Sequence, residues 1–335
     1  MIRKSTMLDL LSNFDKISKI YEPVFKATVE HYNLPNPYIN KTPHYIDFLR
    51  LYKYLDYDLR NDAIPDKIGE VIDRLGVEIF PWSAIWYCYS KAWLIYRQEY
   101  HFDPEFGKLV LSTKFPKTLP VDLLKNPPFN CFYVENPNKK ARSRGYLFFY
   151  YPKEDTNEEP ALLTILGVGI EGRSNESYLT NGVHFKEDTL EECLMFQKDE
   201  VENQENCLDM SEIKEALLLY LYLSAQNAQV SERIKVEKRV KDKGLRYRRE
   251  EGFISIVGEQ YGRLLRRYYQ YEGEDLKTGF KMSPHVRGAH FHHFWIGSKQ
   301  DESLRSLKLR WVEPTFVNLH LGEIKTRVNT VDSRS

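Results

Sequence analysis

Hydrophobic positions in the first hundred residues recur at the spacing of amphipathic helices. Residues 6–21, 45–59 and 82–100 each carry apolar side chains three or four positions apart. The last of these ranges is crowded with tryptophan and tyrosine. We therefore predict that residues 1–115 form a helical layer whose aromatic face packs on a larger body.

The pattern changes to that of β-strands once prolines become frequent, near residue 116. Apolar runs rich in aromatic and branched side chains cover residues 131–134, 146–151 and 161–166, and polar turns separate them. This order predicts an antiparallel meander, in which strands that follow one another in the chain are neighbours in the sheet.

One helix should lie at the centre of this second region. Asp209 and Glu212 have the spacing of a capping box, and residues 217–223 of the following helix are apolar on every side. We therefore predict an α+β fold, in which the helical layer precedes a mixed domain, residues 116–335, with a mainly antiparallel sheet and a buried central helix. A further helix is expected over residues 253–271, and a pair of strands closes the chain.

Charge is concentrated in two blocks, although the whole chain is neutral, with 48 basic and 48 acidic residues. Residues 187–205 are acidic and residues 233–249 are basic. We interpret the basic block as part of a flexible linker, residues 229–251, on the protein surface. The same cations are candidates for contact with RNA phosphates, and they are Lys238, Arg239, Arg246, Arg248 and Arg249.

Composition excludes several classes of protein. A hydrophobic fraction of 42% and an aromatic fraction of 14% exclude general disorder. No apolar stretch approaches the roughly 20 residues that cross a membrane, and the four cysteines are widely spaced, so we expect a cytoplasmic protein with free thiols. The glycine-rich run 167–172 is not followed by a helix pattern, and no phosphate-loop or zinc-protease motif occurs. We therefore expect neither a cofactor nor a bound metal.

A cluster near the C-terminus is the first candidate for a functional site. Four of the nine histidines fall within residues 285–293, interleaved with arginine and aromatic side chains. Tryptophan and arginine dominate binding hot spots, and adjacent strands can take up an extended peptide by backbone pairing. The predicted peptide-binding residues are His285, Arg287, His290, His292, His293, Trp295, Arg310 and Trp311.

Two other interpretations of this cluster stay open. On a strand, His290 and His292 would lie on one face about 7 Å apart. That spacing suits a divalent cation in a strand-transfer nuclease, with Tyr268 or Tyr269 as the nucleophile, although no Asp, Glu or Cys lies within the cluster to complete such a site. Alternatively, the histidines and Trp295 form an amphipathic strand edge with a purely structural role.

Several spaced motifs occur in the second half of the chain. They are Ile256-Val257-Gly258-Glu259-Gln260-Tyr261-Gly262, Arg266-Arg267-Tyr268, Pro284-His285-Val286-Arg287, His290-Phe291-His292 with Trp295, and Arg310-Trp311 with Pro314 and Phe316-Val317-Asn318. In this order they resemble a type V-A anti-CRISPR family and its relatives on phages and other mobile genetic elements, over roughly residues 120–320. The chain has Gly288 and Phe291 where the family pattern carries an arginine and a tryptophan.

The resemblance implies that the chain lowers production of the type V-A CRISPR effector nuclease in a bacterial host cell. It implies recognition of the N-terminal peptide of the effector as that peptide leaves the ribosome, followed by loss of the messenger RNA being translated. The expected partners are the nascent peptide and, at the basic block, the ribosome or messenger RNA, with no membrane. We therefore expect a regulatory binding protein rather than an enzyme. The alternatives are a metal-dependent nuclease of a mobile element and a nucleic-acid-binding accessory protein.

Overall fold

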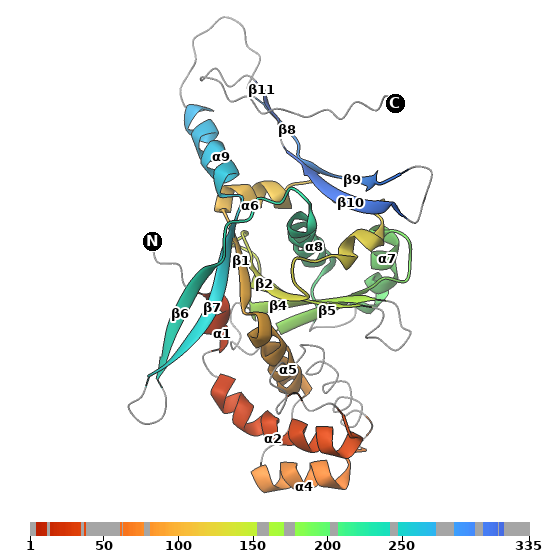
Figure 1. The fold of residues 1–335 in the computed structure, drawn as a ribbon, viewed down its shortest axis with the longest axis vertical. Coiled ribbons are helices and arrows are strands. Elements are labelled where there is room, and N and C mark those ends of the chain that lie inside the picture. Colours follow the sequence, from red (N-terminus) through yellow and green to blue (C-terminus); the bar gives the residue numbers. More distant parts are fainter. Residues whose placement is uncertain are drawn as a thin grey trace, which may run out of the picture.

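A seven-stranded mixed sheet organises the chain in the computed structural model (Figure 1). The strand order is β5-β4-β3-β2-β1-β7-β6. Strand β1 pairs in parallel with β2 and β7, and the other neighbours are antiparallel. The run from β2 to β5 confirms the predicted meander. The strands are β1 (Gln98–Phe102), β2 (Cys131–Glu135), β3 (Ser143–Tyr151), β4 (Leu162–Ile170), β5 (Tyr178–His184), β6 (Ile234–Lys241) and β7 (Tyr247–Val257).

Two small antiparallel pairs stand apart from this sheet. They are β8 (His285–Arg287) with β11 (Thr315–Val317), and β9 (His290–Ile296) with β10 (Ser306–Val312). The second pair confirms the strands predicted to close the chain. The structure describes residues 5–11, 14–34, 37, 61, 63–76, 81–152, 161–170, 178–201, 207–241, 247–272, 285–298, 304–313 and 315–317.

Helices cover both faces of the sheet (Figure 1). They are α1 (Thr6–Leu10), α2 (Phe14–Tyr32), α4 (Asp66–Leu75), α5 (Pro81–Tyr96), α6 (Pro104–Leu111), the 3-10 helix η2 (Val121–Lys125), α7 (Leu190–Val201), α8 (Met210–Ser224) and α9 (Glu259–Glu272). Helices α6, α7 and α8 contribute to one hydrophobic core, and α1, α2 and α5 contribute to a second core. Strand β2 serves both, since Phe132 and Val134 belong to the first core, and Cys131 and Tyr133 to the second.

The predicted fold class is confirmed. N-terminal helices precede a mainly antiparallel sheet, and α8 is the predicted central helix. Its capping box is formed, because Asp209 accepts a hydrogen bond from the backbone N–H of Glu212, and the Glu212 carboxylate accepts one from the N–H of Asp209. Residues 216–223 of this helix are all buried.

One predicted helix ends earlier than expected. The helix expected over 82–100 stops at Tyr96, because Arg97 adopts a left-handed conformation with a φ of 52°. Residues 98–102 then form β1 in the middle of the sheet. The predicted N-terminal region thus contributes a strand to the sheet of the second region. The helix expected over 45–59 lies outside the described residues.

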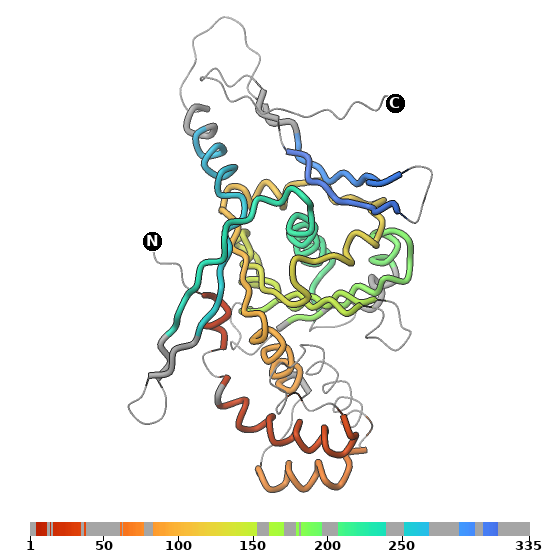
Figure 2. The backbone as a smooth tube through the Cα atoms, viewed as in Figure 1, coloured from red at the N-terminus to blue at the C-terminus, as the bar shows by residue number. Residues whose placement is uncertain are grey.

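The predicted linker over residues 229–251 is replaced by regular structure. Most of it belongs to β6 and β7, which form an antiparallel hairpin beside α1 (Figure 2). The helix expected from residue 253 begins only at Glu259, because 253–257 continue β7 alongside β1. Gly258, with a φ of 71°, ends the strand and turns the chain into α9.

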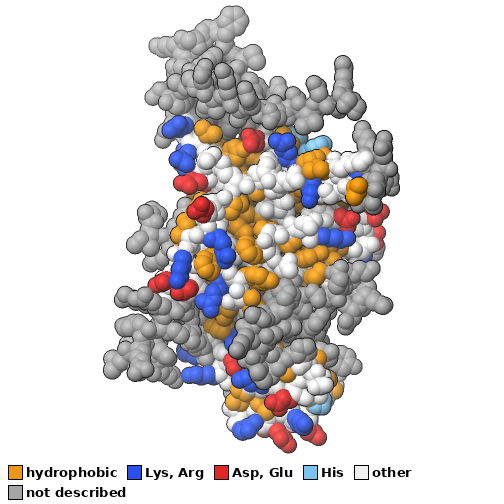
Figure 3. All heavy atoms as spheres, in the orientation of Figure 1, with side chains coloured by type: hydrophobic (Ala, Val, Ile, Leu, Met, Phe, Trp, Pro, Cys, Tyr) orange, Lys and Arg blue, Asp and Glu red, His pale blue; other side chains and the backbone are white. Residues whose placement is uncertain are grey.

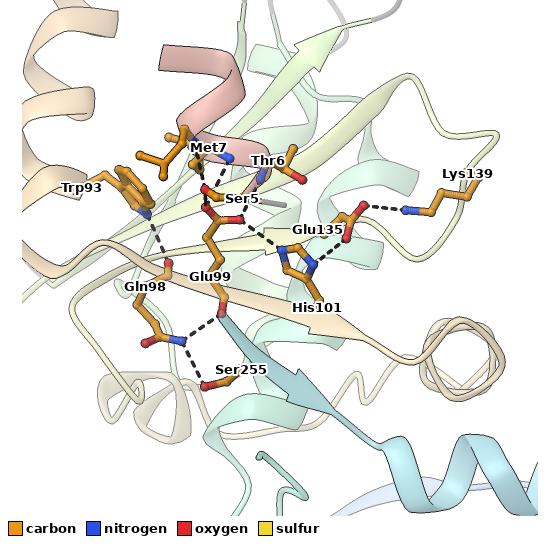
Figure 4. A network of polar contacts seen from close by, with 11 residues as sticks. Ser5, Thr6, Met7, Trp93, Gln98, Glu99, His101, Glu135, Lys139 and Ser255 are labelled. Atoms are coloured by element: carbon orange, nitrogen blue, oxygen red, sulfur yellow. Dashed lines mark hydrogen bonds and ion pairs between the residues drawn. The ribbon is translucent and has the colours of Figure 1, made fainter. Parts of the chain in front are cut away.

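The buried carboxylate of Glu99, on β1, holds the N-terminal helix α1 (Figure 4). It accepts hydrogen bonds from the hydroxyl of Ser5 and from the backbone N–H groups of Thr6, at 3.0 Å, and Met7, at 3.3 Å. These N–H groups belong to the first turn of α1 and have no partner within the helix. One side chain of an interior strand, β1, therefore fixes helix α1 to the sheet.

His101 extends this network to the next strand (Figure 4). Its Nε2 lies 3.1 Å from Oε2 of Glu99, and its Nδ1 lies 3.0 Å from Oε2 of Glu135. Burial alone would lower the pKa of His101, but the hydrogen bonds to Glu135 and Glu99 outweigh burial and raise the pKa to about 9. Burial likewise opposes ionisation of Glu135, yet its hydrogen bond to His101 brings the pKa of this carboxyl down to about 2.

Replacing Glu99 by glutamine should lower the free energy of unfolding by about 2–4 kcal/mol, since an amide cannot accept all the hydrogen bonds that the buried carboxylate accepts. Denaturation in urea measures the loss. The matched control is Glu191→Gln, which only removes a surface ion pair with Lys117 and should cost less than about 1 kcal/mol. Equal losses in the two variants would contradict this role of Glu99.

The raised pKa of His101 predicts a pH dependence of stability. A folded-state pKa of about 9 exceeds the ordinary value of 6.5, so the stabilisation is complete below pH 6.5 and is lost as the pH rises through about 9. Between these pH values the unfolding free energy should fall by on the order of 2–3 kcal/mol more in the wild type than in His101→Gln. Urea denaturation at a series of pH values measures this difference. Parallel profiles for the two proteins would show that the imidazole is not held charged by this network.

Candidate functional site

The β9–β10 hairpin carries most of the predicted peptide-binding residues. Its register pairs His292 with Arg310, Phe291 with Trp311, and His293 with Leu309. Side chains that face each other across an antiparallel pair lie on the same face of the pair. The hairpin therefore has an inner face with Phe291, Leu309 and Trp311, and an outer face with His292 and Arg310.

The inner face is anchored by Trp311, which is 1% exposed. Its ring makes edge contacts with Phe106 of α6 at 5.3 Å, Tyr222 of α8 at 5.3 Å and Tyr261 of α9 at 5.7 Å between ring centroids. Such aromatic contacts contribute beyond the apolar area that they bury. Trp311 therefore differs from expectation, because it supports the hairpin from below instead of facing a partner.

The segment after α8 fixes the edge of β10 that points away from β9. The side-chain amide of Asn227 donates to the carbonyl of Trp311 at 2.8 Å and accepts from its N–H at 3.0 Å. The backbone N–H of Gln226 donates to the carbonyl of Leu309 at 2.9 Å. Asn227 thus supplies the pair of hydrogen bonds that a neighbouring strand would supply.

The outer face of the hairpin presents polar side chains to solvent. His290, His292 and Arg310 are exposed, with Lys308 on the same face. The His292 ring stacks on Phe294 at a centroid distance of 6.3 Å. No residue of β9 or β10 on this face is acidic. The face therefore offers two cations and two imidazoles beside an aromatic ring.

The end of the hairpin is apolar and exposed. Trp295 is 55% exposed, Ile296 44% and Leu304 67%. The guanidinium of Arg305 lies over the Trp295 ring, 5.1 Å from its centroid. Figure 3 shows basic, histidine and hydrophobic side chains close together over the hairpin, at the upper right. An exposed apolar group rimmed by polar residues is typical of an interaction site.

The remaining predicted peptide-binding residues are distributed differently. His285 and Arg287 lie in β8, which pairs with β11, and their side chains lie outside the described residues. His293 is half-buried on the inner side of β9. Burial and the neighbouring His292 lower the pKa of His293.

Four of the candidate RNA-contact residues belong to β6 or β7, and the fifth, Arg246, lies outside the described residues. Lys238 binds α1, with Nζ 2.9 Å from the Asp9 carboxylate and 3.0 Å from the carbonyl of Leu8. This lysine therefore helps to hold α1 against the β6–β7 hairpin. The register places Arg239 opposite Arg249, while the side chains of Arg239, Arg248 and Arg249 lie outside the described residues.

The elements of the nuclease interpretation are only partly brought together. His290 and His292 share the outer face of β9, as the spacing predicts. Among the described residues, no group of three or more His, Cys, Asp or Glu side chains could hold a metal ion. Tyr268 and Tyr269 lie in α9, and their side chains are outside the described part of the chain.

Comparisons with known proteins assign the chain to a family. The family described as "AcrVA2-like: Anti-CRISPR type V subtype A2 family" matches residues 100–319, about two thirds of the chain. The chain belongs to this anti-CRISPR family. The fold is also similar to the structure titled "Crystal structure of AcrVA2", with a TM-score of 0.53, 17% sequence identity, and coverage of 93% of this chain and 97% of that chain. A comparison with curated protein sequences finds no match.

Residues of the recognised A2-family motifs hold the hairpin and α9 in place. The Arg266 guanidinium binds both carboxylate oxygens of Asp103, at 2.9 and 2.8 Å, and Asp103 caps α6. Gly262 lies against Asp103, where a Cβ would come within 1.9 Å of the carboxylate. Gly258 similarly leaves space for the ring of Phe106. These motif residues explain the packing under the hairpin rather than its exposed face.

Sequence reasoning missed the residues that position the hairpin. Asn227 sits in a short polar segment with no periodic pattern, and Asp103 reads only as a helix cap. Neither carries a local signal of its long-range partner. The match to the A2 family includes both residues, as well as the whole of β9 and β10. No described helix of this family member is long and apolar enough to span a membrane.

The two faces of β10 predict opposite effects of neighbouring substitutions. Trp311→Ala should lower the free energy of unfolding by about 3–5 kcal/mol, because it removes a buried ring from an aromatic cluster. Arg310→Ala, on the exposed face, should change it by no more than about 0.5 kcal/mol. Urea denaturation of the two variants checks this, and similar losses would contradict the assignment of faces.

Proposed function

We propose that this member of the A2 family recognises the N-terminal peptide of a type V-A CRISPR effector nuclease during its synthesis, and that recognition leads to loss of the messenger RNA. The observation that carries the proposal is the outer face of the β9–β10 hairpin, with His290, His292 and Arg310 exposed side by side. The buried inner face and the Asn227 bonds keep this exposed face in a defined position.

The arrangement suits recognition of a peptide. Imidazole and guanidinium groups supply directional hydrogen bonds, and the arginine fork is well suited to a carboxylate. Trp295, with Ile296 and Leu304, adds apolar area at one end of the same hairpin. Aromatic side chains next to arginine are typical of the centre of binding interfaces.

Contact with RNA is a second, separable part of the proposal. Because Lys238 is bound to α1, the candidates for phosphate contact are Arg239, Arg246, Arg248 and Arg249. The backbone register brings two basic residues, Arg239 and Arg249, to the same position along the hairpin. A ribosomal or messenger RNA phosphate would be attracted to this concentration of basic residues.

A reporter assay tests the proposed function. The reporter carries the first codons of a type V-A effector, either native or synonymously recoded, and its messenger RNA and protein are measured with and without this chain. The proposal expects both versions to fall equally, because the encoded peptide is the signal. A fall of the native version alone would assign recognition to the RNA, and no fall of either would refute the target.

Variants connect this assay to the hairpin. The double variant His292→Ala with Arg310→Ala should lose most of the reporter repression, by about tenfold or more, because both contacts to the peptide are removed. Lys117→Ala, which removes a surface ion pair with Glu191 and no residue of the hairpin, is the control and should repress like the wild type. Full repression by a correctly folded double variant would show that this face is not the recognition surface.

A further inference from the structure

We infer that the recognised peptide binds as a third strand on the free edge of β9, and this inference rests on the proposed function. The hairpin has two strands and therefore two edges. Gln226 and Asn227 cover the outer edge of β10 at Leu309 and Trp311. Among the described residues, no strand pairs with the other edge, that of β9. Extended peptides commonly bind by adding a strand to such an edge.

The register identifies the backbone groups that this edge presents. Residues opposite each other in an antiparallel pair either exchange both hydrogen bonds or point both away from each other, in alternation. Trp311 directs its N–H and carbonyl away from β9, to Asn227. The carbonyl of Leu309 likewise points away from β9, to the N–H of Gln226. Their partners in β9, Phe291 and His293, must therefore direct their own N–H and carbonyl groups outward.

The same alternation extends along the strand. Trp295, opposite Leu307, also presents its N–H and carbonyl at the edge, whereas His292 and Phe294 use theirs in the ladder with β10. The free edge thus offers donors and acceptors at three alternate residues. Backbone polar groups are strongly favoured to find partners, so this edge is a template for one more strand.

The side chains beside the edge indicate what the added strand carries. On the outer face, its side chains would lie next to His290, His292 and Phe294, with Arg310 and Lys308 one strand further on. Because this face is cationic and lacks a carboxylate, an acidic side chain fits it. Near the end of the hairpin, exposed Ile296 lies on this same face and suits an apolar side chain, while exposed Trp295 offers apolar area on the opposite face. The occupant is therefore an extended peptide with an acidic residue and, further along, an apolar one.

A proline at position 293 tests the edge directly. Proline lacks an N–H and is tolerated in strands where that N–H would point away from the sheet. His293→Pro removes an outward donor and leaves the β9–β10 ladder in place, while His293→Ala removes the same ring and keeps the donor. Affinity for a synthetic N-terminal effector peptide, measured by fluorescence polarisation, should fall at least about tenfold further in His293→Pro than in His293→Ala.

A second measurement uses the wild-type protein and so does not depend on the folding of a variant. Single N-methyl groups are placed along the peptide backbone, one position at a time. A strand that pairs on one edge predicts weakened binding at every second position, because alternate N–H groups face β9. Binding that is insensitive to N-methylation, or that changes without this alternation, would overturn the edge inference.

The outcomes separate this inference from the function on which it rests. Binding of the peptide with equal affinity by the alanine and proline variants overturns the edge and leaves the proposed function standing. No binding by the wild type, together with an unaffected reporter, overturns both. Light scattering measures the oligomeric state as a third test. If the wild type is a dimer and His293→Pro is a monomer, the edge of β9 binds a second copy of this chain, and the inference that it binds a peptide is overturned.

Discussion

The burial of β1 is the constraint on which the rest of the structure depends. All five of its residues are buried, although Gln98, Glu99 and His101 are polar. A buried polar group is costly unless it is hydrogen-bonded, so each of these side chains requires a fixed partner. The amide of Gln98 donates to Ser255 of β7 and to the carbonyl of Glu99, Glu99 binds α1, and His101 binds β2. The hydrogen bonds made by the polar side chains of β1 therefore set the positions of the neighbouring elements on both sides.

Elements whose pattern is local could be predicted from the sequence. The capping box of Asp209, the apolar helix after it and the meander of 131–170 all have signals within a few residues. Strand β1 could not be predicted, because its polar residues are buried through partners that are distant in the chain. The basic hairpin was missed for a similar reason: Lys238 looks like a solvated lysine until α1 supplies Asp9.

The strands that carry the candidate site could be predicted, but the orientation of their side chains could not. Sequence spacing correctly put His290 and His292 on one face and Arg310 on the paired strand. It could not show that Trp311 turns inward, because an alternating strand can present either of its faces to the core, and the choice is made by Phe106, Tyr222 and Tyr261. The hairpin thus divides its aromatic residues between anchoring and exposure.

The parallel pairing of β1 with β7 has a consequence for how this chain is made. Residues 98–102 leave the ribosome early, but their partners at 253–257 follow only in the last third of the sequence. Pairing between segments so far apart is slow to form, and an unpaired strand edge is open to wrong partners in the meantime. The sheet can close only when most of the chain has been translated. We propose that this protein acts on another protein during synthesis of that protein. Its own sheet cannot be completed until residues 253–257 have been synthesised.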